Sequence, residues 1–206
     1  MSTRSARVIA VGAAALALLL AADLGAKEWA LGALSTPRTG DPPPLCTADG
    51  HGMHSMQRLR SDVVVLVGEY LELRYAENCG AAFGFLRTQP QAVRTTLFGL
   101  AAIAASIVLA WMFVRGRGGP LFAWSAPLVV SGAVGNLVDR IRHGFVVDFI
   151  RFHVHDGWEW PTFNVADAAI SVGVALLVID GFRKRPEESV KRSAKVEREA
   201  QSSAKG

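Results

Sequence analysis

Four long apolar stretches constrain the fold of this chain more than any other feature of its sequence. Each approaches the roughly 20 residues that a helix needs to cross about 30 Å of hydrocarbon. The apolar residues run together and do not recur at the spacing of a strand or an amphipathic helix. We therefore predict an all-α polytopic membrane protein with four transmembrane helices, at about residues 6–24, 93–114, 121–138 and 163–182.

The first stretch also has features of a cleaved signal peptide, because Arg4 and Arg7 precede a long apolar core. However, no convincing pair of small residues for cleavage follows the core before Lys27 and Glu28. We expect an uncleaved anchor.

Basic residues predict the orientation. They gather at the amino end, in the RGRGG loop at 115–119 and in the tail, which starts RKR. Four spans place these segments on one side, so the positive-inside rule makes both termini cytoplasmic. The net charge of +4 fits this topology and an attraction to anionic membrane lipids. No basic face interleaved with aromatic residues is visible, so we expect no nucleic-acid partner.

The remaining segments divide the chain further. Residues 25–92 and 139–162 are expected outside, whereas the charged tail at 183–206, beyond a membrane domain at 1–182, is expected to be disordered. Within the outer segment, the Pro- and Gly-rich residues 36–61 predict an irregular insertion. Residues 62–87 form a predicted β region, because DVVVLVGEYLELRY is rich in β-branched and aromatic residues.

Two cysteines, Cys46 and Cys79, are both predicted outside. In an oxidising compartment they would be able to pair, or they are two unrelated thiols, and both interpretations stay open.

Four polar clusters interrupt the apolar sequence: DLGAK at 23–27, NCGAAFGF at 78–85, GNLVDR at 135–140 with VVDF at 146–149, and FNVAD at 163–167. Asp23 and Lys27 are spaced i, i+4, which fits either an ion pair at a helix end or part of a site. Gly80 lies beside Asn78 in NCGAAFGF, where small residues suggest a tight backbone next to a polar pocket. At the end of the third stretch, DR at 139–140 predicts a local ion pair or a site contact.

Two further carboxylates, Asp148 in FVVDFI and Asp167 in FNVADAAI, lie in apolar surroundings at the same membrane face. Burial and mutual repulsion disfavour ionisation of both, so the pair is expected to share one proton. The ionised member would take a proton from water while the protonated member donates to a peptide carbonyl. The histidines lack accompanying ligands at metal spacing, so we expect no metal and no other cofactor.

Two other classes of protein remain to be weighed. A transporter or channel would have acidic residues in the centres of several spans, which the first three lack. A purely structural membrane protein would use each polar cluster as a separate helix-end contact.

Blocks of the sequence resemble a known family. NCGAAFGF (78–85), SGAVGNLVDR (131–140) with HGFVVDF (143–149), and FNVADAAISVG (163–173) resemble in this order the signature blocks of the lipoprotein signal peptidase (signal peptidase II) family. DLGAK (23–27) resembles its first-helix block, and the resemblance covers residues 6–182. The insertion at 36–61 looks longer than the family needs, and Cys46 has no known role there.

The resemblance implies an aspartyl endopeptidase of the bacterial inner membrane, with four transmembrane helices and a small extracytoplasmic β-structured cradle. Its substrates would be prolipoproteins with a diacylglyceryl group on the lipobox cysteine, cut just before that residue at the outer face. We expect a monomer. The resemblance makes Asp148 and Asp167 the catalytic pair, and the residues that bind substrate or support the site would be Asn78, Gly80, Asn136, Asp139, Arg140, Asn164, Asp23 and Lys27.

Overall fold

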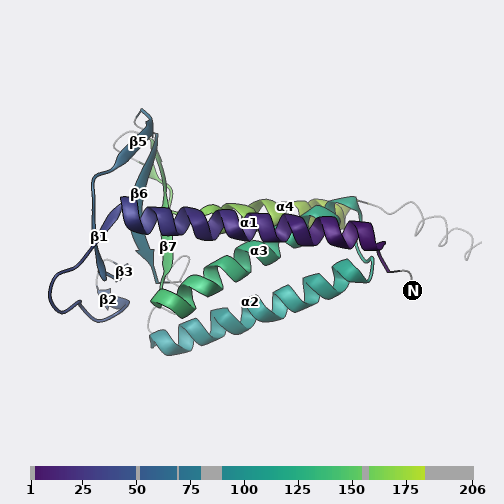
Figure 1. Cartoon of the computed structure of the whole chain (residues 1–206), viewed down its shortest axis with the longest axis horizontal. Helices are drawn as coiled ribbons and strands as arrows, with labels where there is room; N and C mark the ends of the chain where they lie inside the picture. The colour runs from purple at the N-terminus through teal and green to yellow at the C-terminus, as the bar shows by residue number, and fades with distance from the viewer. Residues whose placement is uncertain (1–2, 50–51, 69, 80–89, 155–157, 184–206) are drawn as a thin grey trace, which may run out of the picture.

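The computed structural model describes residues 3–49, 52–68, 70–79, 90–154 and 158–183. The described residues form four helices, and each is long and apolar enough to cross a membrane. Figure 1 shows them side by side, with the β-strands gathered at one end of the bundle and the amino terminus at the other. We call these the sheet end and the far end. The helices are α1 (Ala6–Ala33), α2 (Gln91–Val114), α3 (Pro120–His143) and α4 (Val165–Phe182).

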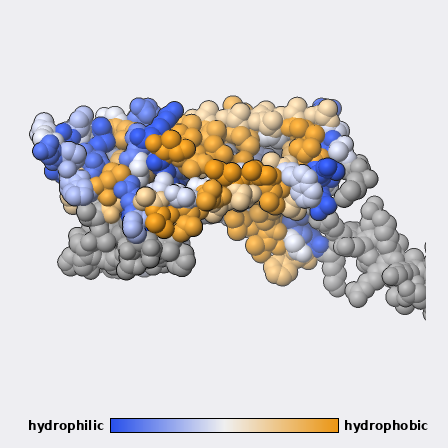
Figure 2. Space-filling model, turned by 90° about the horizontal axis from the view of Figure 1, so that it is seen from below, coloured by the Kyte–Doolittle hydropathy of each residue, from blue (hydrophilic) through white to orange (hydrophobic). Residues whose placement is uncertain are grey.

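Helix α3 is the centre of the bundle, because it packs against each of the other three helices. It starts at Pro120, a residue suited to the first helical turn, and tolerates Pro127 in its interior. Gly144 ends it in the left-handed region, with φ of 81°. Large apolar side chains are exposed on α1, α2 and α4, among them Leu18, Ile107 and Val172. On the face seen in Figure 2, hydrophobic surface covers the helices and hydrophilic surface lies at the sheet end.

Two helices extend further than the apolar stretches predict. α1 continues beyond Leu24 to Ala33, and α3 continues beyond Val138 to His143. In both helices the polar residues taken as signs of an approaching end, among them Lys27 and Asp139, lie inside the helix. They are compatible with a helix interior because each has an oppositely charged partner.

A four-stranded antiparallel sheet of order β5-β6-β7-β8 lies at the sheet end. Its strands are β5 (Val64–Val67), β6 (Leu71–Asn78), β7 (Val146–Val154) and β8 (Trp158–Glu159). β6 and β7 pair with Ala76 opposite Asp148 and Asn78 opposite Val146. The β region predicted at 62–87 thus contains a hairpin, and its residues 80–87 lie outside the described residues.

The segment predicted as an irregular insertion differs from that prediction, because it contains short strands. β1 (Ser35–Pro37) pairs with β4 (Arg58–Arg60), and β2 (Thr47–Asp49) pairs with β3 (Gly52–His54). These strands have only three residues each, too few for a periodic sequence pattern. The tail predicted to be disordered lies, from residue 184 onward, outside the described residues.

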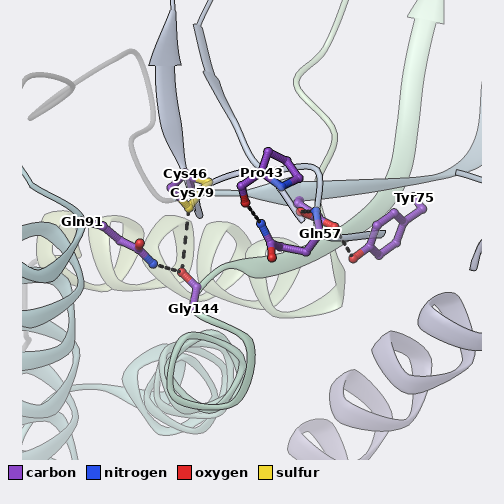
Figure 3. Close-up of a disulfide and its surroundings, with 8 residues drawn as sticks. Pro43, Cys46, Gln57, Tyr75, Cys79, Gln91 and Gly144 are labelled. Atoms are coloured by element: carbon purple, nitrogen blue, oxygen red, sulfur yellow. Dashed lines mark hydrogen bonds between the residues drawn. A yellow bond between two sulfur atoms is a disulfide. The ribbon is translucent and has the colours of Figure 1, made fainter. Parts of the chain in front are cut away.

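The two cysteines form a disulfide between Cys46 and Cys79, with their Cα atoms 5.6 Å apart. Figure 3 shows that the Cys46 sulfur and the Gln91 amide both point at the carbonyl of Gly144. Cys46 is buried in a cluster at the sheet end that also contains Leu34 and Tyr75. The disulfide therefore attaches the insertion to the end of β6, next to the α3–β7 turn.

Two polar contacts join helices at the far end. Arg4 donates from Nε to the carbonyl of Phe113 at 2.9 Å, which ties the start of α1 to the end of α2. Asp180 is buried near the end of α4, and its Oδ2 accepts from the backbone N–H of Gly119 at 2.8 Å. Since Gly119 is the N-cap residue of α3, the carboxylate satisfies one of the free donors of that helix start.

Candidate active site

Asp148 is held by two side-chain amides. It lies on β7 with only 1% of its surface exposed. Asn78 donates from Nδ2 to its Oδ2 at 2.8 Å, and Asn164 donates from Nδ2 to its Oδ1 at 2.7 Å. The β6–β7 pairing explains the first contact, because Asn78 lies opposite Val146 and so shares the sheet face of Asp148.

Asp167 is held by the start of α4. Its backbone N–H donates to Oδ1 of Asn164 at 2.9 Å, and its Oδ2 accepts from the backbone N–H of Asn164 at 3.4 Å. This reciprocal arrangement is a capping box, formed here with an acidic residue at the third helical position. The positive end of the helix dipole also favours a carboxylate in this turn.

Two asparagines connect the carboxylates. Asn136 on α3 donates from Nδ2 to Oδ1 of Asp167 at 2.8 Å, and its Oδ1 accepts from Nδ2 of Asn164 at 3.2 Å. Asn164 therefore contacts Asp148, Asp167 and Asn136. The network brings together residues from β7, α3 and α4 that are well separated in the sequence.

Lys27 fixes the orientation of Asn136. Its ammonium group donates to Oδ1 of Asn136 at 2.9 Å and lies 2.9 Å from Asp23 and 3.1 Å from Asp139. Because lysine is only a donor, the amide oxygen of Asn136 must face it, which leaves the NH₂ group for Asp167. Asp23 and Lys27 form the ion pair that one of the two interpretations of the sequence predicts. Lys27 also contacts the candidate site, through its hydrogen bond to Asn136.

The carboxylates paired with Lys27 also bind backbone. Asp23 Oδ1 accepts from the N–H of Ala166 at 2.8 Å, and Asp139 Oδ2 accepts from the N–H of Val147 at 3.0 Å. Ala166 and Val147 directly precede Asp167 and Asp148 in the sequence. The Lys27 cluster thus connects α1 and α3 to the backbone beside both candidate catalytic residues.

Arg140 lies beside this network. Its Nη1 donates to the backbone carbonyl of Asn136 at 3.1 Å, and its charge acts on Asp148 and Asp167. Asp139, which the sequence alone would pair with Arg140, lies against Lys27. Gly80, the other residue expected at the site, lies outside the described residues.

The chain is similar to known proteins over most of its length. A family model described as signal peptidase (SPase) II matches residues 15–183. The chain belongs to the signal peptidase II family. It is therefore an aspartic peptidase that removes signal peptides from prolipoproteins, and the predictions of family, enzyme class and four-helix membrane fold are confirmed.

Individual relatives support the same assignment. The chain is 44% identical over 123 residues to the lipoprotein signal peptidase of Photorhabdus laumondii, covering 59% of this chain and 72% of that protein. It is 42% identical over 115 residues to the enzyme of the same name from Ralstonia nicotianae, covering 56% and 65%. A bacterial membrane enzyme solved by the in meso method at 2.3 Å shares the fold, with a TM-score of 0.64 at 22% identity over 90% of this chain and 97% of that one.

The electrostatic environment of Asp148 in this candidate site differs from that of a surface carboxylate. Burial, and after it the charge of Asp167, raises the pKa of Asp148 to about 8, although the amides of Asn78 and Asn164 act in the opposite direction. Burial and the neighbouring carboxyl group therefore favour the protonated form of Asp148. Among the described residues, no group of three or more His, Cys, Asp or Glu side chains is placed to hold a metal ion.

Two glycines of α3 also shape the site, and the sequence analysis did not single them out. A Cβ atom at Gly135 would overlap Oδ2 of Asp23, and one at Gly132 would overlap the carbonyl oxygen of Ala166. Both glycines lie in SGAVG, where four small residues among five are a signal of close helix packing. They allow α3 to approach the start of α4 and the first-helix ion pair.

Proposed function

We propose that this chain cuts diacylglyceryl-modified prolipoproteins just before the lipid-modified cysteine, with water activated between Asp148 and Asp167. The observation that carries the proposal is the position of Asn164, whose side-chain amide donates to the carboxyl group of Asp148 and whose backbone N–H donates to the carboxyl group of Asp167. The raised pKa of Asp148 supports it, because one protonated and one ionised carboxyl group are what such a mechanism needs.

In this mechanism the two carboxyl groups have different starting roles. Asp167 accepts a proton from water, and the resulting hydroxide attacks the scissile carbonyl while protonated Asp148 donates to its oxygen. Collapse of the tetrahedral intermediate breaks the C–N bond: Asp148 takes back a proton from a hydroxyl group of the intermediate as the carbonyl forms again, and the proton on Asp167 goes to the leaving amine. Asn78 and Asn164 orient Asp148, whereas Asn136 and the capping box orient Asp167.

The site is expected at the outer face of the bacterial cytoplasmic membrane, in an enzyme that acts as a monomer with both termini in the cytoplasm. The distribution of basic residues supports this orientation, since Arg4 and the RGRGG loop lie at the far end. Labelling of single added cysteines in intact cells would test it. Reagents confined to the outside should modify a cysteine at exposed Asp62 and leave one at exposed Arg115 unmodified, and the reverse pattern would contradict the topology.

Mass spectrometry of a precursor incubated with the purified full chain tests the reaction itself. Asp148→Asn and Asp167→Asn are each expected to slow cleavage by about 10²–10⁴-fold, the usual contribution of a general acid or base. Asp62→Asn, which removes an exposed carboxylate at the same end, serves as the control and should keep the wild-type rate. Wild-type rates in either site variant would refute the assignment.

A second precursor distinguishes the substrate class. The same peptide without the diacylglyceryl group should be cut much more slowly than the modified form, and the product of the modified form should begin with the lipid-bearing cysteine. Equal cleavage of both peptides, or a cut at another bond, would contradict the proposed specificity while leaving the catalytic pair intact.

A further inference from the structure

A cavity lies at the sheet end, away from the candidate catalytic residues. Its volume is about 410 Å³, and its walls include three arginines, Arg38, Arg58 and Arg60, together with Tyr75 and Glu77. Tyr75 and Glu77 alternate along β6 with Ala76 and Asn78, which share the sheet face of Asp148. The cavity is therefore on the opposite face of the sheet from the carboxyl pair, and nothing in the proposed mechanism uses it.

We call this the arginine cavity. Glu77, the one carboxylate among the described residues that line it, accepts hydrogen bonds from uncharged donors. Glu77 accepts from the backbone N–H groups of Gln57 and Arg58, each at 2.9 Å, and from the Tyr75 hydroxyl at 3.1 Å. These bonds hold Glu77 against the wall of the cavity. Three cations and one carboxylate leave the arginine cavity with a positive balance.

Hydrogen bonds fix two of the arginines without neutralising them. Arg58 donates from Nε to Oγ of Ser35 at 2.7 Å and from Nη2 to the carbonyl of Leu31 at 3.0 Å. Arg38 donates from Nε to the carbonyl of Met56 at 3.0 Å. All of these acceptors are neutral, so the bonds pre-organise the guanidinium groups for an anion and do not cancel their charge.

The end of α1 places the arginine cavity near the lipid headgroups. Leu31, which Arg58 contacts, is in the last turn of α1, and the 28 residues of this helix span about 42 Å, more than the roughly 30 Å of hydrocarbon. Trp29, two residues earlier, is 48% exposed, as expected of a tryptophan at the membrane–water boundary. The arginines therefore lie where phosphate groups of lipids are found.

Apolar side chains accompany the charges. Met56 and Leu59 line the arginine cavity and are 55% and 43% exposed. A phosphate group bound to arginines beside exposed apolar side chains matches the chemistry of a lipid, whose charged headgroup is attached to acyl chains. We propose that the arginine cavity binds the headgroup of an anionic phospholipid of the surrounding membrane.

Titration of lipid into the detergent-solubilised full chain tests this site. Phosphatidylglycerol is expected to raise the melting temperature of the wild-type chain more than phosphatidylcholine or inorganic phosphate does. In Arg38→Gln/Arg60→Gln the apparent affinity for phosphatidylglycerol should fall about tenfold or more, because charge-assisted contacts with the phosphate group are lost. Arg142→Gln, which removes an exposed charge at the end of α3, is the matched control and should bind like wild type.

A second variant keeps the test independent of the arginine hydrogen bonds. Leu59→Glu leaves every arginine in place and adds a negative charge at an exposed position, so it should also weaken phosphatidylglycerol binding. Unchanged affinity in both variants would overturn the proposal. It would equally be overturned if inorganic phosphate stabilised the wild-type chain as strongly as the lipid, since the site would then recognise a free anion.

Discussion

Replacing Lys27 by methionine tests whether one buried cation holds the candidate site together. The side chain is 2% exposed and lies 2.9 Å from Asp23 and 3.1 Å from Asp139. Methionine has a similar length but no charge, so both carboxylates would lose this partner while staying buried. Removing one member of a buried ion pair costs about 3–5 kcal/mol. We expect the free energy of unfolding to fall by at least that amount.

Equilibrium unfolding in mixed micelles, followed by tryptophan fluorescence, measures this loss. Glu28→Gln, an exposed change on the next residue of α1, is the control and should alter stability by less than about 0.5 kcal/mol. The double variant Lys27→Met/Asp23→Asn removes one of the two stranded charges. It should lose less than the sum of the single variants, by about 0.5–3 kcal/mol. A loss of only about 1 kcal/mol for Lys27→Met, typical of an exposed ion pair, would refute the reasoning.

Three further predictions concern pH, the disulfide and helix packing. Because the pKa of Asp148 is raised to about 8, this carboxyl group should lose its proton, and the cleavage rate should fall, as the pH rises through 8. A cleavage rate that stays constant up to about pH 10 would contradict the proposal that the two carboxyl groups share one proton. Because an unperturbed carboxyl group loses its proton near pH 3.8, the free energy of unfolding should also decrease between these two values, as denaturant titrations can show. Cys46→Ser/Cys79→Ser removes the disulfide, which joins residues 33 apart in the sequence, and should lower the free energy of unfolding by about 4 kcal/mol by the chain-entropy model. A reducing agent should destabilise the wild-type chain but not this variant. If the wild-type chain did not respond to the reducing agent, the disulfide would contribute nothing to stability. Gly135→Ala should lower the free energy of unfolding by about 1–3 kcal/mol, because the added methyl group overlaps a carboxylate oxygen. Gly25→Ala, whose added carbon meets no neighbouring atom within 4 Å, is the control. Equal stability of the two variants would contradict the packing argument.

The helices could be predicted from the sequence because the bilayer demands long apolar runs. Where they end could not be, since the end of α1 depends on contacts far away in the chain. Lys27 interrupts the apolar pattern, yet it stays inside the helix because Asp139 and Asn136 on α3 surround it. A pattern confined to one stretch of sequence does not contain that information.

The candidate catalytic residues were predictable for a different reason. Asp148 and Asp167 are acidic residues in apolar surroundings, and such residues need a compensating environment wherever they lie. Their asparagine partners were named through the family resemblance, whereas only the structure shows which of the two acidic residues each asparagine contacts. The disulfide was left open because the separation of Cys46 and Cys79 depends on short strands that the sequence does not reveal.

Asn164 couples the start of α4 to the orientation of Asp148. Its side-chain oxygen accepts from the backbone N–H of Asp167 in the first turn of α4, and its side-chain nitrogen donates to the carboxyl group of Asp148. Fraying of that turn would therefore also free the Asn164 side chain that holds Asp148, so the helix start and the orientation of this carboxyl group are coupled. If Asp148 acts as proposed, loss of turnover on heating should accompany the opening of this single helical turn.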